Sequence, residues 1–175
     1  MRTALLALLL AAGAWAADAP TDAEWKPVQQ QLAQDPAAGA TALQGLLKSY
    51  PRWADGHREL ARAQARIGQW REAYGSTQAA LRIKPDDGET FELAVLCAAQ
   101  VNPAKAIEVA GMWKGLDRGR VALQAARAAL RLPKIAEGSK LAQEWLDQAR
   151  ARGIGDTPDA LQVQAVLALR RGDVA

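Results

Sequence analysis

The sequence predicts an all-α fold, a helical-hairpin solenoid of about four helix pairs followed by one extra C-terminal helix. The first observation is a repeat, because Pro51 and Pro85 are 34 residues apart and each closes a segment of helix-periodic apolar residues. Internal periods of this length are typical of stacked helical hairpins. The second is that no stretch shows the alternating pattern of a β-strand. The third is a capping residue followed by proline, which recurs at Asp35-Pro36, Asn102-Pro103 and Thr157-Pro158.

Residues 1–16 have the pattern of a secretory signal peptide. Arg2 supplies a positive charge, residues 4–14 are small and apolar, and residues 14–16 form the small-x-small pattern Ala-Trp-Ala. The apolar run is about half the ~20 residues that span a bilayer. A buried N-terminal helix is the alternative, but it would leave Arg2 and the Ala/Leu surface without an obvious partner. We therefore expect cleavage after Ala16 and export.

The amino-acid composition limits the classes of function that this protein could have. Half of the 175 residues are apolar, which is enough for a core, and the length fits one domain or a short repeat array. Of the 22 Lys and Arg side chains only Arg2 lies in residues 1–16, so the mature chain holds 21 basic and 19 acidic side chains. This small surplus does not indicate a nucleic-acid-binding protein. The single cysteine excludes an intrachain disulfide and favours a bacterial periplasm over a disulfide-rich extracellular space.

The remaining residues, 17–175, are predicted to form one helical-repeat domain. Residues 21–24 (Thr-Asp-Ala-Glu) form a capping box that opens a first helix, in which Pro27 is a poor fit. A second helix runs from Asp35-Pro36 to about Ser49. The clearest hairpin follows within residues 54–87. Further helices are expected at residues 88–100, 103–115, 118–131, 134–152 and 158–171.

The hairpin within residues 54–87 has residues whose physical roles are recognisable. Ala61 and Ala73 allow two antiparallel helices to approach closely, Gly68 ends the first helix, and Pro85 cannot continue the second. The segment resembles a tetratricopeptide repeat through Leu60, Ala61, Gly68, Trp70, Ala73, Ala80, Leu81 and Pro85. It departs from that family at His57, Gln64 and Thr77, where aromatic residues are usual.

The last predicted helix, residues 158–171, is apolar around its whole circumference. A terminal helix of a solenoid normally has a polar outer face. We therefore expect either that residues 158–175 are an unfinished repeat of a longer natural chain, which we favour, or that the exposed face binds a partner or a second copy. The apolar residues that point in different directions are Leu161, Val163, Val166, Leu167 and Leu169.

The sequence offers little for catalysis. His57 occupies a packing position of the repeat, Cys97 lies in an apolar helical run, and the adjacent acids Asp86 and Asp87 precede a helix, where capping residues belong. We find no phosphate-binding glycine loop, no metal-ligand spacing and no nucleophile elbow. The prediction is that the protein is not an enzyme and carries no cofactor or metal.

One set of residues indicates binding. Arg58, Arg62 and Arg66 recur every four residues and form a stripe opposite the apolar face of their helix. The resemblance implies that first helices of each pair line a concave groove that contacts peptides, and 34 residues on this groove continues with Glu92 and Gln100. The arginines would pair with carboxylates of a partner. The alternative is a solvated face with local pairs such as Asp55–Arg58 and Glu59–Arg62. The predicted partner-binding residues are Arg58, Arg62, Arg66, Glu92 and Gln100.

The resulting hypothesis is an exported, periplasmic adaptor that binds a segment of another protein, including an acidic one, and no nucleic acid. The alternative is a structural solenoid segment of a larger cell-envelope export or assembly complex, with no groove ligand and with self-association through the last helix. Residues 118–134 could also form a basic amphipathic helix on anionic lipid. Repeat packing explains the same apolar face, so we do not favour membrane contact.

Overall fold

The computed structural model describes residues 19–115 and 118–172, and the predicted signal peptide lies outside these ranges. Within them the chain forms α-helices joined by short turns, without a strand. No helix in the described part is long and apolar enough to cross a bilayer. The helices are α1 (Asp22–Gln34), α2 (Pro36–Ser49), α3 (Ala54–Arg66), α4 (Trp70–Ile83), α5 (Gly88–Val101), α6 (Pro103–Met112), α7 (Arg118–Ala129), α8 (Ile135–Arg150) and α9 (Pro158–Arg171).

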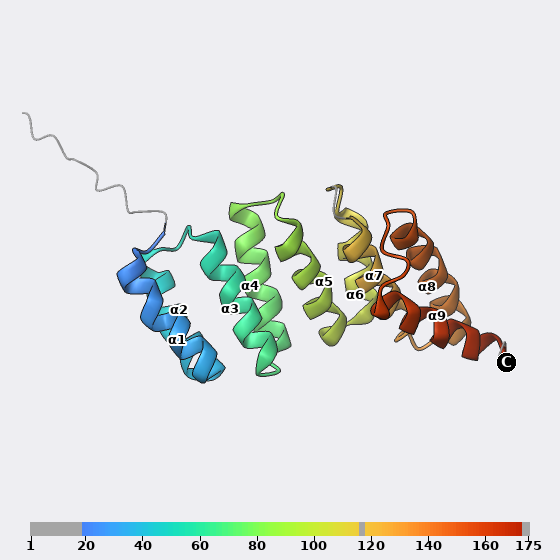
Figure 1. The fold of residues 1–175 in the computed structure, drawn as a ribbon, viewed down its shortest axis with the longest axis horizontal. Coiled ribbons are helices and arrows are strands. Elements are labelled where there is room, and N and C mark those ends of the chain that lie inside the picture. The colour runs from blue at the N-terminus through green and yellow to red at the C-terminus, as the bar shows by residue number, and fades with distance from the viewer. Residues whose placement is uncertain (1–18, 116–117, 173–175) are drawn as a thin grey trace, which may run out of the picture.

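The helices stack as consecutive pairs along one axis, which gives an elongated molecule (Figure 1). Each helix packs against the next one in the chain, and α5 additionally packs against α3 and α7. Helix α9 contacts both α8 and α7. Helices α3, α5, α7 and α9 therefore form one continuous side of the stack, which we call the odd-helix face. This arrangement confirms the predicted all-α helical-hairpin solenoid.

Several helix starts are set by capping residues visible in the sequence. The Asp35 carboxylate accepts a hydrogen bond from the backbone N–H of Ala37 at 2.9 Å, and the Asn102 side chain accepts one from Ala104 at 3.0 Å. Each cap satisfies N–H groups that lack an intrahelical partner. Pro27 lies inside α1 without ending it. The expected helix over residues 103–115 is shorter, because the backbone of Trp113 is extended and its ring packs against Phe91, with centroids 4.7 Å apart.

The polar residues at the aromatic positions of the hairpin are accommodated by hydrogen bonds. Gln64 and Thr77 are buried on α3 and α4. The Ser76 hydroxyl donates to Gln64 Oε1 at 2.7 Å, and the Thr77 hydroxyl donates to the carbonyl of Tyr74 at 2.7 Å. Because the Gln64 oxygen and the Thr77 hydroxyl are paired, the desolvation penalty of burying them is reduced. These bonds explain how the hairpin keeps its spacing without the large rings.

Two apolar clusters form the core. The smaller one joins α2 and α3 through Leu43, Leu47 and Leu60, with α1 packed against it. The larger one runs through α5 to α9 and is rich in alanine, especially on α7. Small side chains allow close helix contact but bury little area each. Each cluster is made of side chains from neighbouring helices of the stack, as expected for a repeat protein.

Helix α9 is covered on one side and exposed on the other. Val163 and Leu167 are buried against the preceding helices, whereas Leu161 and Leu169 are 52% and 62% exposed. Within the described residues, Leu161 and Leu169 are therefore left uncovered. A longer natural chain and a partner at this face both stay predictions.

The close approach of α1 and α2 can be tested at two glycines of α2. A methyl group at Gly39 would lie 2.5 Å from the Cα atom of Leu32, whereas one at Gly45 would meet no atom within 4 Å. We expect Gly39→Ala to lower the free energy of unfolding by about 1–3 kcal/mol through overpacking. Gly45→Ala should raise it by about 0.5–1 kcal/mol, because alanine favours the helix. Urea unfolding followed by circular dichroism measures both, and equal stabilities would contradict the tight α1–α2 contact.

Candidate functional site

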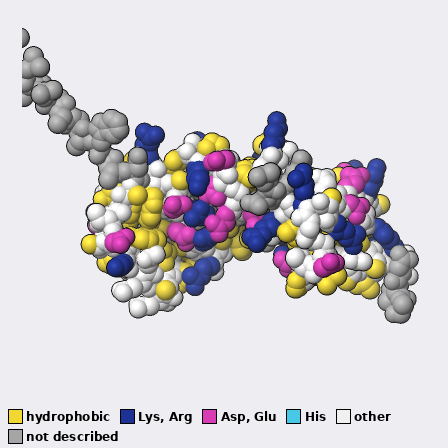
Figure 2. Space-filling model, turned by 45° about the horizontal axis from the view of Figure 1, so that its top comes forward, with side chains coloured by type: hydrophobic (Ala, Val, Ile, Leu, Met, Phe, Trp, Pro, Cys, Tyr) yellow, Lys and Arg dark blue, Asp and Glu magenta, His cyan; other side chains and the backbone are white. Residues whose placement is uncertain are grey.

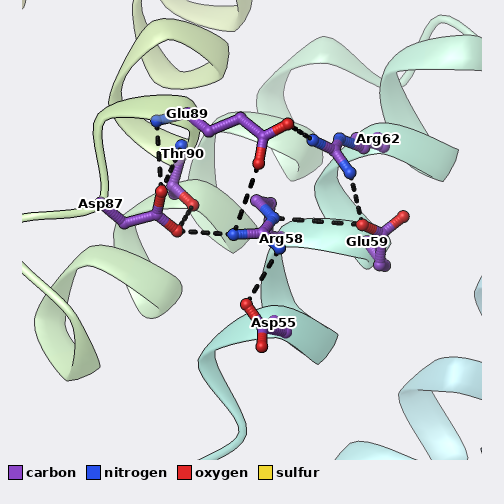
Figure 3. Close-up of polar contacts among 7 residues, drawn as sticks. All are labelled: Asp55, Arg58, Glu59, Arg62, Asp87, Glu89 and Thr90. Carbon is purple, nitrogen blue, oxygen red and sulfur yellow. Dashed lines mark hydrogen bonds and ion pairs between the residues drawn. The ribbon is translucent and has the colours of Figure 1, made fainter. Parts of the chain in front are cut away.

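The predicted arginine stripe on α3 is joined to carboxylates in the structure. Arg58 Nη1 lies 2.7 Å from Asp87 Oδ2, and Arg58 Nη2 lies 3.0 Å from Asp55 Oδ1. Arg62 pairs with Glu59 on its own helix and with Glu89 in the first turn of α5. Figure 3 shows these side chains converging between α3 and the start of α5. Both local pairs of the solvated-face interpretation are present, together with pairs to the next hairpin.

The contact between Arg58 and Asp87 is shielded from solvent. The two side chains are 17% and 10% exposed. Burial acts to raise the pKa of Asp87, but hydrogen bonds from the Thr90 hydroxyl and backbone N–H and from Arg58 outweigh it and hold that pKa below its ordinary value. Burial acts to lower the pKa of Arg58, and the Asp87 hydrogen bond with the surrounding carboxylates raises it instead. The cluster thus links α3 to the N-terminus of α5, where Asp87 is also the helix cap.

The other predicted residues are placed apart from one another. Arg66 is exposed and donates from Nη1 to the carbonyl of Leu32 on α1 at 3.3 Å. Glu92 is half-buried on α5, and Gln100 is exposed near the end of α5, where it accepts a hydrogen bond from Arg131 at 3.1 Å. Of the five predicted residues, Arg58 and Arg66 line one hollow between α1 and α3, whereas Gln100 lines a different one. Their role in partner binding stays a prediction.

A groove on the odd-helix face extends from the end of α5 across α7 to α9. We call it the C-terminal groove, and its volume is about 380 Å³. Its floor is apolar, and its rim carries three arginines and three glutamines. None of the described residues that line it is acidic. The lining residues are Leu96, Ala99 and Gln100 of α5, Gln124, Arg127, Ala128, Leu130 and Arg131 in and after α7, and Gln162, Val163, Val166 and Arg170 of α9.

The three groove arginines are positioned mainly by neutral groups. Arg131 Nη1 donates to Gln100 Oε1 at 3.1 Å. Arg170 Nη2 donates to the carbonyl of Leu130 at 2.6 Å, which ties the end of α9 to the end of α7. Arg127 Nη1 lies 3.3 Å from Asp159 Oδ2 at the start of α9, in an exposed pair. Towards the C-terminal end, Figure 2 shows further basic side chains beyond the mixed acidic and basic patch over the middle of the molecule.

Part of this groove could be predicted from the sequence. Gln100 belongs to the predicted set, whereas Arg127, Arg131 and Arg170 do not. The contribution of α9 was missed, because its rotation about its own axis is set by tertiary packing. The sequence does contain a pattern that places these α9 residues on one face of the helix: Gln162, Val166 and Arg170 recur every four residues, as the α3 arginines do.

The residues considered for catalysis have packing roles. His57 Nε2 lies 3.0 Å from the carbonyl oxygen of Pro51. Cys97 is fully buried, and burial raises the pKa of its thiol to about 11. Among the described residues, no group of three or more His, Cys, Asp or Glu side chains is placed to hold a metal ion. The absence of enzymatic activity stays a prediction.

The fold defines this protein as a helical-hairpin solenoid with a basic groove on its odd-helix face. Comparison with protein families adds no further assignment: no family model matches the chain. A search of curated proteins likewise finds no match. The fold and the groove geometry therefore carry the functional argument.

Asp87→Asn tests the link between α3 and α5. Asparagine retains the helix cap but loses the charge that faces Arg58, so we expect a loss of about 1–3 kcal/mol at pH 7. Because the folded chain holds the pKa of Asp87 below its ordinary value of 3.8, this stabilisation exists above that value and disappears as the pH falls through the folded pKa. The stability difference from the wild type should shrink as the pH falls below 3.8 and vanish below the folded pKa.

Urea unfolding at a series of pH values measures this difference. Asp86→Asn is the control, because Asp86 is the exposed neighbour of Asp87 and its substitution should change stability little. A difference for Asp87→Asn that does not shrink as the pH is lowered from neutral to below 3.8 would show that the charge of Asp87 is not the stabilising feature.

Alkylation tests the environment of Cys97. Since the thiolate is the reactive form and the pKa is raised to about 11, iodoacetamide at pH 8 should label the folded protein far more slowly than the protein in urea. Mass spectrometry over time gives both rates. Rapid labelling of the folded chain would contradict the burial of Cys97.

Proposed function

We propose that this protein is an exported, tetratricopeptide-like adaptor that docks a segment of another protein in the C-terminal groove. The observation that carries the proposal is the groove itself, which combines an apolar floor with a polar rim across three helices. Apolar area supplies most of the affinity in such sites, and polar groups fix orientation. The hairpin geometry supports the family resemblance, because Ala61 and Ala73 are fully buried and Gly68 is left-handed.

The groove has the dimensions for a short peptide. Neighbouring helices lie about 8–10 Å apart, so three of them span roughly 20 Å. An extended chain advances about 3.3 Å per residue, which gives room for about six residues. The rim glutamines offer both donors and acceptors, which suits the N–H and C=O groups of an extended backbone. A docked segment would therefore find partners for its backbone as well as its side chains.

The α3 arginines are the second candidate for partner contact. Binding a carboxylate to Arg58 or Arg62 would require existing ion pairs to Asp87 and Glu89 to open. The groove arginines carry no such network, and Gln100 from the predicted set lies beside them. We therefore place docking at the C-terminal groove, with Arg66 and Glu92 as outlying positions on the same face.

Export and a periplasmic location are part of the proposal and rest on residues 1–16. The competing function is a structural subunit of a larger envelope assembly, without a groove ligand. The exposed Leu161 and Leu169 on α9 favour it, because large apolar side chains at the end of a stack suit a contact with another chain.

Site-specific photocrosslinking in cells distinguishes the two functions. A photoreactive amino acid at Gln162, on the groove, should give a crosslink to a defined partner segment. The matched control is Gln148, which is exposed on α8 outside the groove lining. Crosslinks from Leu161 alone would favour the structural subunit. Identical adducts from Gln162 and Gln148 would rule out docking in the groove.

A further inference from the structure

We infer that the C-terminal groove selects an acidic segment of its partner, and that Asp159 acts as an internal competitor for Arg127 until that segment binds. The inference rests on the proposed function and names the chemistry of its ligand. It is carried by the contrast between two sets of arginines on the same face.

The first step is charge. On α3, Arg58 lies within 4.0 Å of four carboxylates, and Arg62 pairs with two, so those positive charges are compensated inside the chain. The C-terminal groove is lined by three arginines and by no acidic residue in the described part of the chain. Among the described residues, the ion pair within 4.0 Å that involves these arginines is that of Arg127 with Asp159. A ligand that carries carboxylates complements this charge.

The second step is donor geometry. A guanidinium has five N–H donors, and it binds carboxylates best with two of them in parallel. Arg131 contacts Gln100 through one terminal nitrogen, and Arg170 is held by the neutral oxygens of Leu130 and Ser139. These contacts hold Arg131 and Arg170 in place, and neither has a carboxylate within 4.0 Å in the described part of the chain. Such pre-positioning reduces the ordering cost when a carboxylate arrives.

The third step is the class of ligand. A polyanion without apolar groups would use the arginines but not the floor of Ala99, Ala128 and Val163. A peptide with acidic and small apolar residues uses both, and the rim glutamines can pair with its backbone. The ligand that fits all three features is an extended acidic segment of a protein.

The ion pair between Arg127 and Asp159 is weak enough for a ligand to displace Asp159. The Arg127 and Asp159 side chains are 41% and 53% exposed, and their closest charged atoms are 3.3 Å apart. Exposed pairs of this kind contribute little to stability, so an incoming carboxylate can displace Asp159 at small cost. Removing the Asp159 charge should therefore make Arg127 more available without unfolding the helix.

Peptide binding tests the inference with the mature chain. The probe is a fluorescein-labelled eight-residue peptide of alternating Glu and Ala, compared with the same peptide in which Gln replaces Glu. Fluorescence anisotropy should show binding of the Glu peptide that weakens with salt, and at least tenfold weaker binding of the Gln peptide. Arg131→Glu and the milder Arg131→Gln should each weaken binding. Arg82→Glu, at an exposed position of α4, should not.

The competitor has its own matched pair of variants. Asp159→Asn should tighten binding of the Glu peptide about two- to fivefold, the value of one exposed ion pair. Asp147→Asn removes a similar exposed pair, with Arg150 at 3.4 Å, outside the groove, and should leave affinity unchanged. Unchanged or weaker binding by Asp159→Asn would overturn its role as competitor. Circular dichroism confirms that each variant is folded.

The remaining outcomes separate this inference from the proposed function. Equal affinity for the Glu and Gln peptides overturns the acidic preference. If Gln162 crosslinks to a partner segment without acidic residues, the inference fails while docking in the groove stands. If the Glu peptide binds but Gln162 captures no partner segment, the proposed function fails. Binding of anionic phosphatidylglycerol vesicles that depends on Arg131 and exceeds peptide binding would overturn the assignment of a protein ligand.

Discussion

Close approach of antiparallel helices is the constraint on which this structure depends. Ala61, Ala73 and Ala80 are almost completely buried where α3 and α4 meet, and a larger side chain at any of them would separate the backbones. The same principle operates on α7, where alanines dominate the buried surface. Tight pairing within hairpins leaves one face of each odd helix available to its neighbours, so the odd-helix face and its groove follow from the packing.

The same residue type has two different surroundings on this face. Arg58 and Arg62 meet the carboxylates of Asp87 and Glu89 from the next hairpin and serve as connectors. Arg131 and Arg170 donate hydrogen bonds to carbonyl, amide and hydroxyl oxygens, which are neutral and do not balance the positive charge. The distinction matters for function, because only uncompensated charge can attract a ligand at a distance. The C-terminal groove and the α3 arginines therefore belong to one face of the molecule but have separate roles.

Much of the fold could be predicted from the sequence, because local signals determine it. Asp35, Asn102 and Thr157, each followed by proline, begin helices where expected. The end of α6 was not predictable, since it depends on the Trp113 ring packing against Phe91. Likewise, helical periodicity shows that three arginines share a face, but not that the start of α5 supplies their counter-ions.

The double role of Asp87 has a mechanical consequence. Its carboxylate caps α5 and also binds Arg58 on α3, so one side chain fastens the apolar cluster of the first three helices to the one that begins at α5. Bending the molecule between α3 and α5 would therefore strain the Arg58–Asp87 ion pair and the N-terminal cap of α5 at the same time. We therefore infer that resistance to bending at this point is partly electrostatic and weakens when Asp87 is protonated.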